Sequence, residues 1–204
     1  MKIIGINGNP GSGKTTVLVD RLGHMVLNKN IPPQSILAIT YNNTAADEMK
    51  NRFSSQFGEI YGKQIDFRTI NSLALKIYRD YCRKTNRPER KLINEDNDVE
   101  RRRLLGEVFK QHSGEYAAEN DILELSSAIT YIKNMMLTDE QICEIESEYP
   151  HLKAMYESYQ KSLKDNYRMD FDDQMVFALW ILQKDDEIIS ALRARYKYIC
   201  VDEA

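Results

Sequence analysis

The stretch GNPGSGKTT, from Gly8 to Thr16, decides the fold of this 204-residue chain because it meets every fixed position of the phosphate-binding loop GxxxxGK[ST]. Glycines in such a loop let successive backbone N–H groups point into one concavity that holds a polyphosphate. Lys14 would reach the β- and γ-phosphates as a catalytic residue, and the hydroxyl of Thr15 would ligate Mg²⁺. The predicted nucleotide-binding residues are Gly8, Asn9, Pro10, Gly11, Ser12, Gly13, Lys14, Thr15 and Thr16.

The segments on either side of this loop suit a nucleotide site. Lys2 to Asn7 reads as a short apolar strand, and Thr15 to Asn28 continues with apolar residues at helical spacing. Strand, loop and helix follow in the order that the motif requires, and the positive end of the helix dipole adds to the attraction for phosphate. We therefore expect ATP and Mg²⁺ as cofactors. The alternative is a glycine-rich surface turn that binds nothing.

Strand-like and helix-like segments alternate over the first part of the chain, which is typical of a parallel sheet with crossover helices. The predicted elements are strands over Ser35 to Thr40 and Gln64 to Thr69, and helices over Ala45 to Phe57 and Ser72 to Arg83. From about Pro88 to Tyr167 only helical spacing is found, with no convincing strand. A helix over Asp170 to Gln183 and an apolar strand over Arg195 to Asp202 close the chain.

The composition indicates a soluble globular chain. Hydrophobic residues make up 42% of it, and its longest apolar run, Val176 to Leu182, is far shorter than the roughly 20 residues that cross a bilayer. We therefore expect no membrane contact and, because Met1 lies almost against the first strand, a cytoplasmic protein without a signal peptide. The three cysteines are far apart and predict neither a disulfide framework nor a zinc site. A net charge of -3 argues against holding duplex DNA by bulk electrostatics and leaves room for a local groove.

The last strand ends on Asp202 and Glu203, which suits the second half of a phosphate-loop site. A carboxylate at the C-terminal end of a strand beside the phosphate loop can hold Mg²⁺, and the next acid can orient the attacking water. We assign Asp202 to the metal together with Thr15, and Glu203 to the catalytic base. The alternative is a pair of acidic residues at a frayed end.

Six ordered stretches carry a resemblance to one family. They are GNPGSGKTT (8–16), ILAITYNNTAADEM (36–49), TINS (69–72), SSAITYIKN (126–134), YESYQKSLKDNYRMDFDDQ (156–174) and YICVDEA (198–204). In this order they are similar to motifs in the N-terminal motor core of the UvrD/Rep/PcrA-type superfamily 1 DNA helicases. The resemblance covers nearly the whole chain.

This resemblance implies a fold and a domain division. The fold would be α/β, with a RecA-like P-loop parallel sheet that has helices on both faces and is interrupted by an all-helical subdomain. Residues 1–87 would form the first part of the core, residues 88–167 the inserted helical subdomain, and residues 168–204 the closing helices and the Walker B strand. Arg21 resembles the arginine that approaches the adenosine in these enzymes.

The resemblance also implies a groove for single-stranded DNA, or for a duplex with a single-stranded tail. The residues that would line it are Thr40, Tyr41, Asn43, Thr69, Asn71 and Ser72. Tyr41 offers a ring face on which a base can stack, and the others can donate to phosphates without reading sequence. The alternative for Tyr41 is that it caps a strand and packs in the core. Thr44 and Asn71 replace the usual lysine and histidine of the family, which predicts weaker DNA binding.

The function implied is the N-terminal ATP-binding part of an ATP-dependent DNA helicase or translocase that moves on single-stranded DNA. The sequence stops at Ala204, before the Gln of the DExQ motif, so we expect a fragment whose partner is the remainder of a helicase chain and which is inactive as a motor alone. The alternatives are the motor subunit of a helicase-nuclease, a P-loop small-molecule kinase, and a non-catalytic nucleotide-binding module.

Overall fold

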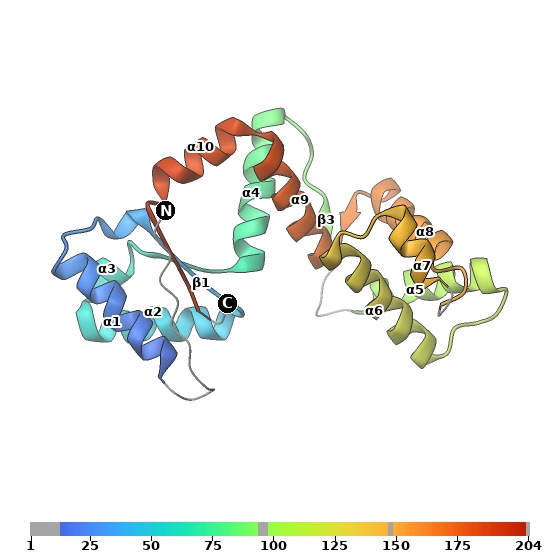
Figure 1. Cartoon of the computed structure of the whole chain (residues 1–204), viewed down its shortest axis with the longest axis horizontal. Coiled ribbons are helices and arrows are strands. Elements are labelled where there is room, and N and C mark those ends of the chain that lie inside the picture. Colours follow the sequence, from blue (N-terminus) through green and yellow to red (C-terminus); the bar gives the residue numbers. More distant parts are fainter. Residues whose placement is uncertain (1–12, 94–97, 147–148, 203–204) are drawn as a thin grey trace. The chain divides into compact units, whose positions relative to one another are not determined.

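The computed structural model describes residues 13–93, 98–146 and 149–202 (Figure 1). The chain divides into two compact units. The sheet unit comprises Met1–Lys76 and Lys184–Ala204, and the helical unit comprises Ile77–Gln183. None of the helices among the described residues is long and apolar enough to cross a membrane.

The sheet unit is built on three parallel strands in the order β2-β1-β5. They are β1 (Ile36–Thr40), β2 (Asp66–Thr69) and β5 (Tyr198–Val201). Every residue of the central strand β1 is buried, as expected of an apolar strand covered on both faces. The structure thus confirms these three predicted strands with shorter bounds, whereas the strand expected over Lys2 to Asn7 lies outside the described residues.

Helices cover both faces of β1. Alternate residues of a strand point to opposite sides, so the side chains of β1 pack in two separate clusters. Ile36 and Ala38 pack in one cluster with apolar residues of α1 (Lys14–Leu27) and α2 (Asn43–Phe57). Leu37 and Ile39 pack in another cluster with Tyr196, with Leu73 of α4 (Ile70–Thr85) and with Leu192 of α10 (Asp186–Arg195). Two short helices, η1 (Pro33–Ser35) and α3 (Glu59–Gly62), complete this unit.

Hydrogen bonds from side chains fix where the helices of the sheet unit begin. The side chain of Asn42 accepts from the backbone N–H of Ala45 at 2.8 Å, so α2 begins at Asn43 rather than at the predicted Ala45. Asp185 caps α10 in the same way, accepting from the N–H of Ile188 at 3.0 Å. The Tyr196 hydroxyl donates to Asp66 of β2 at 2.5 Å. Burial, and to a smaller extent this hydrogen bond, raises the pKa of Tyr196 to about 12.

The helical unit contains α5 (Asp98–Ser113), α6 (Glu119–Met135), α7 (Asp139–Ile145), α8 (Leu152–Asp165) and most of α9 (Phe171–Lys184). Its core gathers apolar residues that recur at helical spacing. They are Leu105 and Val108 of α5, Leu125, Ile129 and Ile132 of α6, and Leu152, Met155, Tyr159 and Leu163 of α8. The helical character predicted for this part of the chain is therefore correct.

The helical unit also holds a pair of strands that the sequence did not predict. Strand β3 (Lys91–Leu92) pairs in parallel with β4 (Arg168–Met169). The expectation that residues 88–167 contain no strand is wrong for β3. A two-residue strand is too short to produce an alternating pattern, which is the signal by which a strand is recognised.

The divisions between the two compact units fall inside helices, after Lys76 in α4 and after Gln183 in α9. Residues 77–85 of α4 belong to the helical unit, and two aromatic side chains of this part contact α9. Tyr78 stacks on Phe177 with ring centroids 5.6 Å apart, and Tyr81 meets Trp180 edge-on at 5.7 Å. Aromatic pairs of this kind add to the stability given by buried area alone. They join α4 and α9 within the helical unit.

A buried polar network lies among α5, α6, α8 and the start of α9. The Lys133 ammonium is 2.6 Å from a carboxylate oxygen of Asp170 and 2.8 Å from one of Asp173, and its side chain is 1% exposed. The Tyr159 hydroxyl also donates to Asp170, at 3.0 Å, and Arg101 donates to the hydroxyl of Ser126 at 2.6 Å. Two buried carboxylates therefore share one buried cation.

Candidate functional site

The candidate nucleotide site begins at the N-terminus of α1. Gly13 caps this helix in the left-handed conformation, with φ 83°, which side chains other than glycine rarely adopt. Lys14 is the first residue of the helix and Thr15 the second. The first-turn N–H groups of a helix attract anions, so this end of α1 is suited to phosphate.

Thr15 and Asp202 meet although 187 positions separate them in the chain. The Thr15 hydroxyl donates to a carboxylate oxygen of Asp202 at 2.9 Å. Asp202 directly follows β5, and its backbone N–H donates to Ile39 of β1 at 2.9 Å, which fixes it at the carboxyl end of the sheet. Asp202 is only 8% exposed. The structure thus brings together the two residues to which the sequence assigned the metal.

The donor set at this point suits Mg²⁺. The ion prefers oxygen ligands, commonly one or two carboxylates together with phosphates and water. A buried carboxylate and a hydroxyl at a helix N-terminus provide two such oxygens. Among the described residues, no group of three or more His, Cys, Asp or Glu side chains is placed to hold a metal ion.

Three other predicted nucleotide residues lie on α1. Lys14 is partly exposed, and Thr16 and Arg21 are exposed. Arg21 acts electrostatically on β5: burial raises the pKa of the Cys200 thiol, and the positive charge of Arg21 opposes that rise. Arg21 is thus close enough to β5, which Asp202 follows, for its charge to act on a side chain of that strand. The remaining predicted residues, Gly8, Asn9, Pro10, Gly11, Ser12 and Glu203, lie outside the described residues.

The predicted DNA residues lie at the carboxyl ends of β1 and β2. Thr40 and Thr69 are register partners as the last residues of these two parallel strands. Tyr41 follows Thr40 and is 75% exposed, so the alternative in which it packs in the core is wrong. Asn43 and Asn71 follow in the first turns of α2 and α4. The strand order places all of them at the edge of the sheet that also carries Asp202.

Several of these polar side chains already have partners within the chain. Thr40 is 2% exposed, and its hydroxyl donates to the carbonyl of Asn42 at 3.1 Å. Thr69 is 6% exposed and accepts from the N–H of Ser72 at 3.1 Å, while the Ser72 hydroxyl donates back to the carbonyl of Thr69 at 2.9 Å. These bonds hold the turns after β1 and β2, and the exposed residues among the predicted DNA contacts are Tyr41 and Asn43.

Sequence reasoning missed the residue that positions Tyr41. Asn42 caps α2 and thereby fixes the turn in which Tyr41 stands exposed between strand and helix. The signal was present, because an asparagine directly before a helical pattern is a typical N-cap. The interpretation of this stretch gave Asn43 a DNA-binding role and left Asn42 without one.

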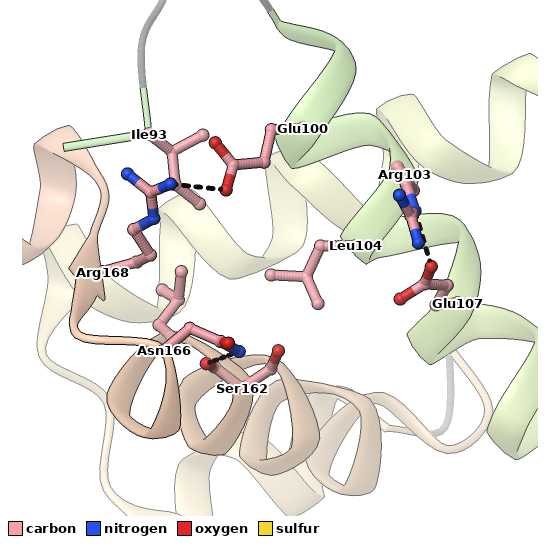
Figure 2. A pocket seen from close by; sticks show the side chains of 9 residues that line it. Ile93, Glu100, Arg103, Leu104, Glu107, Ser162, Asn166 and Arg168 are labelled. Atoms are coloured by element: carbon pink, nitrogen blue, oxygen red, sulfur yellow. Dashed lines mark hydrogen bonds and ion pairs between the residues drawn. The ribbon is translucent and has the colours of Figure 1, made fainter. Parts of the chain in front are cut away.

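A pocket of about 290 Å³ lies in the helical unit, and none of the predicted site residues lines it (Figure 2). Charged side chains from α5 and from the β4 region line it, and they are paired with one another. Arg168 lies 3.2 Å from Glu100, and Arg103 lies 2.8 Å from Glu107, as the dashed lines in Figure 2 mark. Because these charges are already matched, the pocket has no feature that would select a polyphosphate.

Comparison with known proteins agrees with this geometry. The family model described as UvrD/REP helicase N-terminal domain matches residues 2–204. The chain is similar to a probable DNA helicase II homolog of Mycoplasma capricolum, with 29% identity over 99% of this chain and 28% of the relative. It is also similar to the ATP-dependent DNA helicase UvrD1 of Mycobacterium leprae, with 29% identity over 95% of the chain and 25% of the relative.

A third relative is the ATP-dependent DNA helicase PcrA of Staphylococcus aureus, which is 26% identical over 97% of the chain and 27% of its own length. The chain therefore spans about a quarter of the length of the curated relatives that it matches.

Proposed function

The chain belongs to the UvrD/REP helicase family, whose N-terminal domain it matches, and from this premise we propose that it is the ATP-binding part of an ATP-dependent DNA helicase that moves on single-stranded DNA. In this proposal the sheet unit has the RecA-like arrangement of a motor core, and the helical unit is its inserted subdomain. The relatives named as ATP-dependent DNA helicases support ATP as the nucleotide and DNA as the substrate.

The observation that carries the proposal is the contact between Thr15 and Asp202. A hydroxyl at the start of the helix after a phosphate loop, next to a carboxylate at the end of a parallel strand, is the arrangement by which P-loop NTPases hold their metal. A glycine-rich turn that binds nothing would have no need to bring these two groups within 2.9 Å of each other.

Each group has a role in this proposal. Lys14 and the N-terminus of α1 bind the β- and γ-phosphates. Thr15 and Asp202 hold Mg²⁺, which when bound neutralises charge on the phosphate oxygens. Glu203 orients the attacking water. Arg21 extends the positive potential along α1 towards the nucleoside.

Tyr41 is the proposed stacking platform for single-stranded DNA at the sheet edge. Tyr41 is 75% exposed and lies between the end of β1 and the N-cap of α2, so its ring is open to a base. Asn43, Asn71 and the turn held by Ser72 and Thr69 would contact the backbone from the same edge. Such contacts give binding without sequence preference, which a motor on single-stranded DNA needs.

Titration calorimetry of ATP in the presence and absence of Mg²⁺ tests the nucleotide site. We expect Lys14→Ala to abolish binding. Mg²⁺ should strengthen ATP binding by the parent, and in Asp202→Asn this strengthening should be at least about tenfold smaller, because one coordinating charge is lost. Asp186→Asn, an exposed carboxylate on α10, is the matched control and should bind as the parent does. Equal affinity for the parent and Lys14→Ala would place the nucleotide elsewhere.

Fluorescence anisotropy with a labelled oligothymidylate tests the DNA edge. Tyr41→Ala should weaken binding by about 1 to 3 kcal/mol, the usual contribution of one stacked base. Tyr131→Ala removes another exposed tyrosine, from α6, and should leave the affinity unchanged. Unchanged affinity in Tyr41→Ala would contradict the proposed groove.

The family match bears on two of the alternative functions. The small-molecule kinase has no support from a family match that covers residues 2–204. The motor subunit of a helicase-nuclease uses the same nucleotide site and DNA edge, so it is a variant of this proposal rather than a rival to it.

A further inference from the structure

A second exposed surface in the helical unit combines arginines with aromatic rings. We call it the arginine–aromatic surface; it consists of Tyr81 on α4, Arg87 and Arg90 in the following loop, and Phe177 and Trp180 on α9, and the buried Tyr78 stacks on Phe177. The guanidinium carbon of Arg90 lies 5.1 Å from the ring centroid of Phe177, and that of Arg87 lies 6.0 Å from the centroid of Tyr81. None of these residues belongs to the predicted nucleotide or DNA site.

Hydrogen bonds hold the loop that carries the two arginines. The backbone N–H of Arg87 donates to the carbonyl of Cys82 at 2.9 Å, and that of Arg90 donates to the Tyr78 hydroxyl at 3.0 Å. The next residue, Lys91, donates to the carbonyl of Tyr167 at 2.9 Å as β3 begins. The arginines are therefore presented by a fixed backbone, which lowers the entropy lost when a ligand binds them.

The charge around this surface is opposite to that of the whole chain. The stretch 79–91 contains six arginines and lysines and two acidic residues, whereas the chain has a net charge of -3. The two acidic residues pair with other arginines: Glu89 lies 3.1 Å from Arg79, and Asp80 lies 2.6 Å from Arg83. Among the described residues, neither Arg87 nor Arg90 pairs with a carboxylate. Their N–H groups thus remain available to an anion.

Trp180 gives this cationic surface a ring on which a base can stack. It is 47% exposed and meets Tyr81 edge-on, and Tyr81 in turn lies under Arg87. Single-stranded nucleic acid presents phosphates and unpaired bases in alternation, and proteins bind it with cations and aromatic rings side by side. An acidic protein segment would match the arginines and would leave the exposed indole without a partner.

We propose that the arginine–aromatic surface is a second contact for single-stranded DNA, in which Arg87 and Arg90 bind phosphates and Trp180 stacks on a base. This inference rests on the proposed function, because it takes DNA as the ligand. It differs from that function in its site, since Tyr41 and its neighbours belong to the sheet unit and this surface belongs to the helical unit.

Trp180 itself reports on the proposal, because it is the only tryptophan in the chain. Oligothymidylate added to the 204-residue chain should quench Trp180 emission in a saturable way. The double variant Arg87→Ala, Arg90→Ala should bind the oligonucleotide about tenfold more weakly and reduce the slope of log K against log salt by about 1.4, at 0.7 for each phosphate contact on a single strand. Arg103→Ala, which removes an exposed arginine from α5, should change neither value.

Anisotropy of labelled oligothymidylate, measured in parallel, separates this inference from the proposed function. Quenching that persists in Tyr41→Ala and is lost in the double arginine variant supports the second contact. Binding that depends on Tyr41 without any change in Trp180 emission overturns the second contact and leaves the proposed function intact. No binding at all contradicts the proposed function. Equal quenching by polyglutamate overturns the second contact in favour of an acidic protein partner. Circular dichroism of each variant confirms that it is folded.

Discussion

Lys133 illustrates how much one residue can determine, because it is a cation between two carboxylates in the core of the helical unit. Burial by itself would raise the pKa of Asp170, but the charge of Lys133 and the hydrogen bonds around this carboxylate lower it below its ordinary value. For Asp173 burial outweighs the same lysine and raises the pKa. Removal of Lys133 would leave two buried carboxylates without their cation.

We expect Lys133→Met to cost about 3 to 5 kcal/mol in the free energy of unfolding, which is the usual result when one partner of a buried ion pair is removed. Urea unfolding followed by circular dichroism measures this. Lys161→Met, an exposed lysine on α8, is the matched control and should change the free energy by less than about 0.5 kcal/mol. A Lys133→Met protein as stable as the control would mean that the carboxylates do not depend on this lysine.

The two buried carboxylates should make the free energy of unfolding of Lys133→Met rise as the pH falls, whereas the contribution of Asp170 in the parent falls with the pH. A carboxylate whose pKa is lowered on folding stabilises the protein above its unfolded pKa of about 3.9, and this stability is lost as the pH falls. Without Lys133, burial raises the pKa of both carboxylates, so their penalty at neutral pH is relieved when they take up protons. The difference between parent and Lys133→Met should therefore shrink from pH 7 towards pH 4, and a constant difference would contradict this account.

Some of these residues carry a clear signal in the sequence, and others carry none. Thr15 and Asp202 were predictable because each belongs to a motif whose chemistry requires the other. The exposure of Tyr41 could not be decided from its residue type, since a tyrosine after a strand packs inward as readily as outward. The burial of Lys133 was hidden by its charge, because a lysine beside the apolar positions Ile129 and Ile132 is normally assigned to solvent.

Helices α1 and α2 pack closely because Gly23 leaves space for an aromatic ring. A Cβ atom at Gly23 would overlap the ring of Phe57 at the end of α2. The ring centroid of Phe57 lies 5.2 Å from that of Phe53, which is fully buried. The position of α2, and with it the turn that carries Tyr41, therefore depends on a residue without a side chain.

Gly23→Ala should destabilise the chain by about 1 to 2 kcal/mol, because overpacking at a close helix contact exceeds the roughly 1 kcal/mol gained in helix propensity. In the Phe57→Ala background the same substitution should become stabilising by about 1 kcal/mol, since the overlap is gone. Thermal or urea unfolding of the four proteins in this double-mutant cycle measures the change of sign. A stabilising effect in both backgrounds would show that the ring moves aside without cost.

Elements with a long periodic pattern could be predicted, and elements defined by pairing could not. The apolar stretch from Ile36 and the helical spacing of α6 and α8 each carry their own signal, so the three sheet strands and the helical unit were recognised. Strands β3 and β4 have two residues each and exist only through their hydrogen bonds to one another. Helix α4 ends at Thr85 rather than at the predicted Arg83, and the Thr85 hydroxyl donates to the carbonyl of Tyr81 at 2.8 Å in this last turn.

At the scale of the whole molecule, two compact units share two continuous helices. The boundary at Ile77 lies within α4, and the boundary at Gln183 lies within α9. Thr15 and Asp202 both belong to the sheet unit, so a nucleotide held by them contacts residues of that unit. Local unfolding free energies differ across a protein, and a ligand stabilises only those states that bind it.

Mg²⁺-ATP should therefore protect one unit more than the other from hydrogen exchange. At a concentration of about 100 times the dissociation constant, binding adds about 2.7 kcal/mol to the bound state, which corresponds to about 100-fold slower exchange in segments that open only when the site is lost. Peptides that cover β1 and β5 should slow towards this limit, whereas peptides from the core of α6 should keep their rates, because α6 can open while the site stays intact.

Lys14→Ala at the same ATP concentration is the control and should show no protection in either unit. Equal slowing in α6 and β1 would mean that the two units unfold as one cooperative body, joined through the helices α4 and α9, and would contradict this prediction.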